Sequence, residues 1–194
     1  MDIKGEYQIA ADRQTVWAAL NDPEMLRQCI QGCEALVRTG DNQFEGKVAA
    51  AIGPVRAKFN MVIRLENVVA PESYTLSGES KAGSVGFGRG SADVALREQD
   101  GGTLLTYSAA FKVGGKLAQV GSRLVLGATR KMADDFFGGL SRELEAVGAA
   151  EPAQSDAAAA RARQPPEASR NAFRIPLVAG IAVAGLLLWW FLVR

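Results

Sequence analysis

The chain has 194 residues, with 22 lysines and arginines against 21 aspartates and glutamates, so its formal net charge is +1. This balance gives no strong positive electrostatic potential that would attract nucleic acid, so nucleic-acid binding is not expected. The absence of histidine removes the most common general base and most zinc- or iron-site designs. Cys29 and Cys33 could still be soft ligands, but two cysteines do not complete a four-ligand site, which favours ordinary packing thiols.

The first thirty residues have the pattern of one strand followed by two short helices. Polar and apolar residues alternate over 2–9, which predicts a half-buried strand. Asp12 and Asp22 are each placed as a helix N-cap, and Pro23 fits the first position of the second helix. Gly32 lies just beyond the predicted end of that helix.

The next eighty residues have a period of two, which is typical of half-buried strands. Gly53-Pro54 and the Asp100-Gly101-Gly102 run are predicted turns. With the first strand, we expect a meander of about seven antiparallel strands. The apolar lines that define the later strands lie in 44–52, 55–65, 74–76, 92–96 and 103–113.

The pattern returns to helical spacing over 117–147 and predicts one long amphipathic helix. A strand, two short helices, a curved antiparallel sheet and a long helix across it form the α+β helix-grip arrangement, which leaves a cavity between sheet and helix. Gly121 and Gly127 lie within the predicted helix, where they indicate either close packing or room for a ligand.

The inward positions of these elements form a predicted apolar pocket suited to a flat guest. Tyr74 and Tyr107 could donate hydrogen bonds to a carbonyl oxygen, or could be ordinary half-buried sheet residues. The candidate ligand-binding residues are Leu26, Ile30, Phe59, Met61, Ile63, Tyr74, Leu76, Phe87, Tyr107, Phe111, Leu117, Val120, Gly121, Leu124 and Ala128.

The glycine-rich segment 83–90 does not have phosphate-loop spacing and does not lead into a helix, so no nucleotide site is expected. Its glycines favour bulges and a bend, with Phe87 on a candidate gate. Asp134 and Asp135 are adjacent on a helix and indicate solvated surface, not an acid–base couple. No catalytic constellation is found, and the sequence favours a carrier or adaptor over a catalyst.

Three parts are predicted: a domain over 1–148, a flexible linker over 149–174 and a transmembrane tail anchor over 175–193. The tail has nineteen residues without a charge and would span ~28 Å as a helix. Arg161, Arg163, Arg170 and Arg174 precede it, which predicts a domain on the cytoplasmic side of the membrane. The N-terminus has no signal-peptide pattern, so export is not expected.

Several motifs resemble those of the CoxG family of carbon monoxide dehydrogenase subunits, over roughly residues 1–147. They are VWAALNDPEMLRQCIQGCE, GPVRAKF, GFGRGSADV, VGGKLAQVGSRL and DDFF. Gln31 departs from the family, which usually has proline there. The resemblance implies a START-like (SRPBCC, Bet v 1-like) helix-grip fold and a non-catalytic accessory role for a molybdenum-containing carbon monoxide dehydrogenase. It also implies attachment of that enzyme to the inner face of the cytoplasmic membrane.

The same family is linked to a respiratory quinone bound in the helix-grip cavity. Our leading hypothesis is therefore a membrane-anchored adaptor that recruits the dehydrogenase and takes a quinone from the bilayer, without a metal or nucleotide cofactor. Two alternatives stay open: a helix-grip enzyme of the cyclase or hydrolase type, and a membrane scaffold whose core is filled. A void of several hundred Å³ between sheet and helix separates a carrier from a scaffold.

Overall fold

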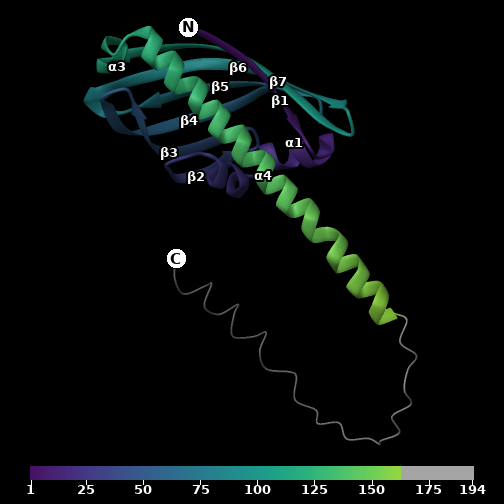
Figure 1. Ribbon diagram of the computed structural model, residues 1–194. Helices are drawn as coiled ribbons and strands as arrows, with labels where there is room; N and C mark the ends of the chain where they lie inside the picture. The colour runs from purple at the N-terminus through teal and green to yellow at the C-terminus, as the bar shows by residue number, and fades with distance from the viewer. Residues whose placement is uncertain (163–194) are drawn as a thin grey trace, which may run out of the picture. The chain divides into compact units, whose positions relative to one another are not determined.

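Seven antiparallel strands form one curved sheet that wraps around a long helix (Figure 1). The computed structural model describes residues 1–162, with side-chain detail for residues 1–148. The order across the sheet is β1-β7-β6-β5-β4-β3-β2, so every neighbouring pair except β1 and β7 is consecutive in the chain. The strands are β1 (Asp2–Ile9), β2 (Cys33–Gly40), β3 (Gln43–Ile52), β4 (Val55–Val69), β5 (Ser73–Lys81), β6 (Gly86–Gln99) and β7 (Gly102–Gly115).

The two short helices after β1 are α1 (Arg13–Asn21) and α2 (Pro23–Cys29), and both predicted caps are confirmed. The Asp12 carboxylate accepts a hydrogen bond from the Thr15 N–H at 3.0 Å, and the Asp22 carboxylate accepts one from the Glu24 N–H at 3.0 Å. Each carboxylate satisfies an N–H that has no partner within its own helix.

The predicted number of strands is confirmed, but the sequence pattern did not locate β2. This strand lies at one edge of the sheet, and Leu36 is its one fully buried residue. Val37 is 54% exposed, so the strand has no clear alternation of apolar and polar residues. A further short helix, η1 (Gly83–Val85), connects β5 to β6.

The long helix predicted over 117–147 is interrupted, which corrects that prediction. A short helix, α3 (Lys116–Gln119), ends before the long helix α4 (Ser122–Ala162) begins. Gly121 lies between them with φ +94°, in the left-handed region that glycine adopts without a steric penalty. The break changes the direction of the chain before α4 crosses the sheet (Figure 1).

Helix α4 is longer than predicted, because its backbone continues to Ala162, past the expected start of the linker at residue 149. Alanine is frequent in this segment and has the highest helix propensity of the amino acids. Residues Met1–Ala157 form one compact unit. Among the residues that the structure describes, no helix combines the length and apolar character needed to cross a membrane. The predicted span 175–193 lies outside those residues.

The apolar core is divided into two clusters at the two ends of the sheet. The larger cluster contains Leu140 and Leu144 of α4, packed with Ile9 and Leu105 from the sheet. The smaller cluster contains Leu117 of α3 with buried residues of the sheet and its connections. Between the two clusters, the inner face of the sheet is not filled by side chains from α4.

Candidate functional site: an apolar cavity between sheet and helix

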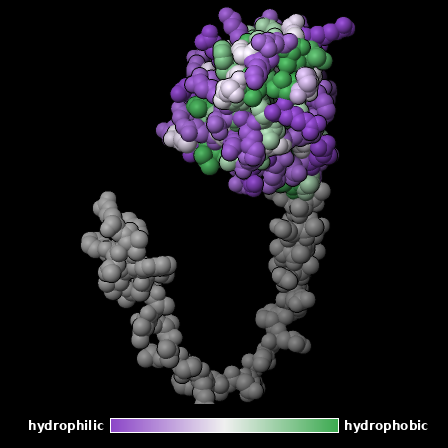
Figure 2. Space-filling model, turned by 90° about the vertical axis from the view of Figure 1, so that its left-hand side faces the viewer, coloured by the Kyte–Doolittle hydropathy of each residue, from purple (hydrophilic) through white to green (hydrophobic). Residues whose placement is uncertain are grey.

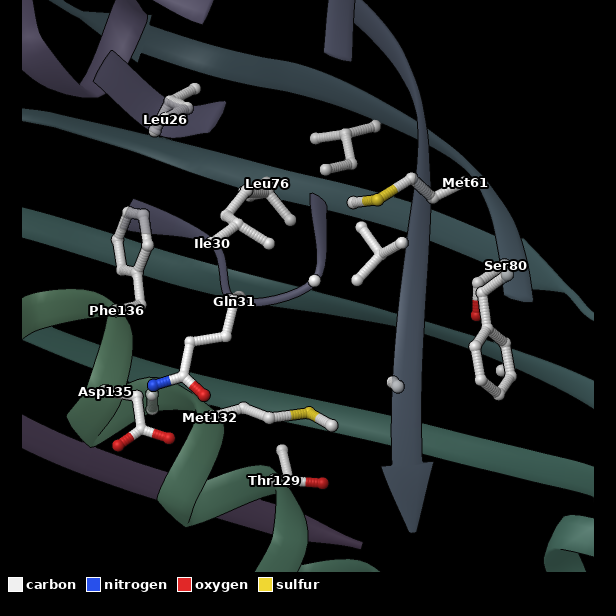
Figure 3. A pocket seen from close by; sticks show the side chains of 18 of the residues that line it. Leu26, Ile30, Gln31, Met61, Leu76, Ser80, Thr129, Met132, Asp135 and Phe136 are labelled. Carbon is white, nitrogen blue, oxygen red and sulfur yellow. The ribbon is translucent and has the colours of Figure 1, made fainter. Parts of the chain in front are cut away.

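A cavity of about 860 Å³ lies between the inner face of the sheet and α4. This volume is within the range of sites that hold small organic ligands. Figure 3 shows side chains of the sheet, α2 and α4 that surround it. Most of the lining residues are apolar, and they come from every strand of the sheet as well as from α1, α2, α3 and α4. The interior of the domain therefore contains an open cavity, whereas a pure membrane scaffold would have a filled core.

Small side chains on opposite walls explain why this space is left open. Ala128, Thr129 and Ala133 line the cavity from the first third of α4, where a helix packed directly on a sheet would carry large residues. Gly88 and Ala92 of β6 line it from the sheet. Met132 lies at the opening, and the large residues Phe137, Leu140 and Leu144 further along α4 pack in the larger core cluster. The sequence of α4 thus encodes an open stretch in its first third and a packed stretch after it.

Ten of the fifteen candidate ligand-binding residues line this cavity. They come from α2, β4, β5, β7, α3 and α4 and the connection after α2, and the alternation of the strands places their side chains on the concave face. Their role in ligand binding stays a prediction. These ten are Leu26, Ile30, Phe59, Met61, Ile63, Tyr74, Leu76, Tyr107, Leu117 and Ala128.

The other five candidates, Phe87, Phe111, Val120, Gly121 and Leu124, are not part of the cavity wall. Phe87 is 44% exposed, and a Cβ built on Gly114 would lie 2.3 Å from its ring, so Phe87 covers Gly114. Leu124 is 54% exposed, whereas its neighbour Val125 is buried, so Leu124 lies on the outer side of the first turn of α4.

Val120 and Leu124 instead lie beside the turn between β3 and β4. A Cβ built on Gly53 of that turn would be 3.2 Å from Val120 Cγ1 and 3.6 Å from Leu124 Cδ1. The contact brings the α3–α4 junction against the β3–β4 hairpin at one end of the sheet. These residues therefore close the end of the domain and do not face the cavity.

Tyr74 is the buried polar side chain of the wall. Its ring meets the Trp17 ring edge-on, with centroids 5.5 Å apart. Burial raises the pKa of the Tyr74 hydroxyl to about 12. Within residues 1–148 this hydroxyl forms no hydrogen bond, and its oxygen is not among the fully buried atoms that lack a partner. The hydroxyl can therefore donate a hydrogen bond to a ligand that has an acceptor oxygen.

Tyr7 and Tyr107 attach α4 to the sheet through the ring of Phe137. The Tyr7 ring stacks on Phe137 with centroids 4.3 Å apart, and Tyr107 stacks on the same Phe137 at 5.7 Å. The Tyr7 hydroxyl donates a 2.5 Å hydrogen bond to the Asp134 carboxylate. Burial, and then this hydrogen bond, raise the pKa of Tyr7 above its usual value. Asp134, predicted as solvated surface, therefore has a partner on β1.

Polar side chains gather where the cavity opens, between α4 and the α2–β2 connection (Figure 3). Gln31 comes from that connection, and Thr129, Lys131 and Asp135 come from α4. The Lys131 ammonium lies 2.7 Å from the Asp135 carboxylate, so the two charges are paired. The sequence did not indicate these residues as part of the site, because the two segments meet only in the folded chain. Met132, 41% exposed, lies at the same opening.

Both cysteines are free thiols outside this wall. Cys29 is buried against α4, where a Cβ added to Gly139 would be 3.5 Å from the Cys29 Cα. Burial raises the pKa of the Cys29 and Cys33 thiols, which keeps both protonated and unreactive at neutral pH. In the part of the chain that the structure describes, no three His, Cys, Asp or Glu side chains are grouped as metal ligands.

A curved antiparallel sheet that surrounds a long helix over an apolar cavity defines the helix-grip class of proteins. Solved structures agree with this class. A conserved protein from Geobacillus kaustophilus has a TM-score of 0.70 and 28% identity, covering 75% of this chain and 95% of its own. Ara h 8.0201 (TM-score 0.55, 11% identity, 75% and 98% covered) and the Zhui aromatase/cyclase from Streptomyces sp. R1128 (0.54, 11%, 75% and 93%) share the Bet v 1-like fold.

The sequence profile of the CoxG family of carbon monoxide dehydrogenase subunits matches residues 5–145. The chain therefore belongs to the CoxG family, and the resemblance drawn from its motifs is confirmed. None of the curated proteins compared with the chain matches it.

Proposed function

We propose that this protein is a membrane-anchored accessory protein of molybdenum-containing carbon monoxide dehydrogenase, and that it binds a respiratory quinone in its cavity. Membership of the CoxG family supports the accessory role and the partnership with the dehydrogenase. The apolar segment 175–193 supports attachment to the cytoplasmic membrane, with the domain on the cytoplasmic side. Quinone binding would place an electron acceptor of the respiratory chain next to the enzyme.

The observation that carries the quinone proposal is the cavity of about 860 Å³ with apolar walls and a Tyr74 hydroxyl that forms no hydrogen bond within residues 1–148. A quinone has a flat apolar ring, which suits these walls, and carbonyl oxygens, which accept hydrogen bonds. Tyr74 would hold one carbonyl, and Tyr107 lies on the same wall. The ring and its apolar tail would displace water from apolar surface, which is favourable in proportion to the area covered.

The direct test is the recovery of quinone from the full-length protein, purified gently from the membrane fraction and extracted with organic solvent. Mass spectrometry should find quinone in a fixed ratio to protein. The same extraction from an unrelated single-span membrane protein, prepared in the same detergent, measures carry-over of membrane lipid. If the folded protein yields no more quinone than that control, the carrier proposal is wrong.

Tyr74→Phe is expected to weaken quinone binding about fivefold, which corresponds to the ~1 kcal/mol of one net hydrogen bond. Because the pKa of Tyr74 is raised to about 12, its hydroxyl stays protonated across neutral and mildly alkaline pH, and wild-type affinity should be constant there. The contribution of this neutral phenol to stability should be lost only as pH rises from about 10 towards 12. Quenching of intrinsic fluorescence by added quinone measures the affinity. If Tyr107→Phe weakens binding and Tyr74→Phe does not, the donor is Tyr107.

The structure favours a carrier over a helix-grip enzyme. The ionisable residues of the wall other than the tyrosines are Lys131 and Asp135, and they are paired with each other at the opening. An acid–base catalyst would instead need an ionisable group beside the guest, inside the cavity. The likeness to the Zhui aromatase/cyclase, at 11% identity, concerns the fold alone.

A further inference from the structure

Charged residues are segregated along the sequence of the domain. The stretches 46–65, 80–92 and 101–133 contain eleven lysines and arginines and no aspartate or glutamate. The remainder of residues 1–148 contains six lysines and arginines against eighteen aspartates and glutamates. All eleven basic side chains are exposed: Lys47, Arg56, Lys58, Arg64, Lys81, Arg89, Lys112, Lys116, Arg123, Arg130 and Lys131.

The fold brings most of these residues to one end of the sheet. The β3–β4 hairpin, the β5–η1–β6 connection and the β7–α3 junction all lie at the end marked by α3, opposite α1 (Figure 1). The pairing of strands places Arg89 directly opposite Lys112, and Lys81 opposite Phe87. We define the basic end as Arg56, Lys58, Lys81, Arg89, Lys112, Lys116 and Arg123.

The positive charge of the basic end is only partly neutralised. Lys58 pairs with Glu34 at 2.6 Å, and Lys81 pairs with Glu79 at 3.7 Å. The other five residues of the basic end form no ion pair within residues 1–148. At the opposite end, Glu72 and Glu98 share Arg13, and Asp12 and Asp100 lie nearby in the connections. The domain therefore has a strong charge difference between its two ends despite a net charge close to zero.

Exposed apolar side chains lie among these basic residues. Phe87 is 44% exposed and Leu124 is 54% exposed, and both belong to the segments that form the basic end. Figure 2 views the domain from this side and shows hydrophobic residues surrounded by a largely hydrophilic surface. Bulky apolar side chains within a basic surface are typical of proteins that contact anionic membranes: the cations bind lipid headgroups and the apolar side chains enter the interface.

We propose that the basic end binds the anionic headgroups of a lipid bilayer, with Phe87 and Leu124 inserted at the interface. This contact is made by the domain itself and is independent of residues 175–193, so it goes beyond the proposed function. Leu117 of α3 belongs both to this end and to the cavity wall. Docking of the basic end would therefore bring one wall of the cavity beside lipid. Nucleic acid would use the charges but would leave the two apolar side chains in water.

The test measures which lysines become protected when the full-length protein is incorporated into lipid nanodiscs. A water-soluble acetylating reagent modifies exposed lysines, and mass spectrometry reads the rate at each position. Nanodiscs of phosphatidylcholine alone are compared with nanodiscs that also contain phosphatidylserine. Lys4, an exposed lysine of β1 outside the basic end, is the internal control.

We expect the acetylation rates of Lys58, Lys81, Lys112 and Lys116 to fall severalfold in the anionic nanodiscs, while that of Lys4 is unchanged. High salt should reverse the protection, because contacts between exposed charges are screened. Equal rates in both kinds of nanodisc overturn the proposal. Protection that appears only when the dehydrogenase is added, or when nucleic acid is added, also overturns it, because the partner would then be that macromolecule.

A pair of charge-reversal variants makes the test specific. Lys112→Glu combined with Lys116→Glu should remove the protection of Lys58 and Lys81, whereas Lys4→Glu should leave it intact. Quinone content, measured on the same samples, separates this inference from the proposed function. Unprotected lysines in a wild-type protein that retains quinone overturn the inference alone, and protected lysines without quinone overturn the carrier proposal alone.

Discussion

Ala128→Phe is expected to reduce quinone affinity more than tenfold, a loss of at least ~1.4 kcal/mol. Ala128 lies in the first third of α4 and lines the cavity, so a phenyl ring there would occupy the space of the guest. The fold should tolerate the ring, because it enters open volume and does not strain a filled core. Fluorescence titration with quinone measures the change, and circular dichroism checks the fold.

The matched control for this substitution is Ala146→Phe, at an exposed position on the same helix. It adds the same ring to α4 without touching the cavity and should leave affinity within twofold of wild type, a difference under about 0.5 kcal/mol. Unchanged affinity in a folded Ala128→Phe protein would show that the guest does not occupy this cavity. Equal loss in both variants would indicate an effect on the helix and not on the site.

Leu140→Ala is expected to lower the free energy of unfolding by about 3 kcal/mol, within the 2–5 kcal/mol range for buried leucines. Leu140 is 0% exposed and packs in the larger core cluster, so its truncation leaves a new void in a filled region. Guanidinium unfolding of the full chain in mild detergent, followed by circular dichroism, gives the value.

Met132→Ala is the comparison for this second variant, on the same helix. Met132 is 41% exposed at the opening of the cavity, so its truncation only widens an existing space and should cost less than about 1 kcal/mol. Similar losses for both variants would contradict the division of α4 into an open stretch and a packed stretch that follows it.

The strand pattern predicted the interior of the sheet well, because a period of two fixes which side chains share a face. Phe59, Met61 and Ile63 of β4 all reach the cavity wall as expected. The prediction placed Phe87 in the cavity wall because the glycines around it hide the alternation of inward and outward side chains. Ala92 and Val94 of the same strand point inward, and counting back from them in steps of two places Phe87 on the outer face of the sheet.

Features that depend on contacts between distant segments could not be predicted from local patterns. Gln31 and Asp135 both line the cavity, although they are far apart in the sequence. Tyr7 and Asp134, also distant in the sequence, form the hydrogen bond that attaches α4 to the sheet. The break at Gly121 was also missed, since helical periodicity continues on both sides of it and only the backbone angle shows the interruption. The sequence did not predict β2 because this edge strand has one buried residue and therefore no clear alternation of apolar and polar positions.

The placement of the apolar core at the two ends of the sheet has a consequence for how a guest is exchanged. Side chains of the chain itself pack both ends of the domain. If a quinone binds in the cavity as proposed, its occupancy would add stability only in proportion to the logarithm of its free concentration relative to its dissociation constant. Its release would then require no unfolding of either packed end, as repeated loading and emptying of one molecule demands.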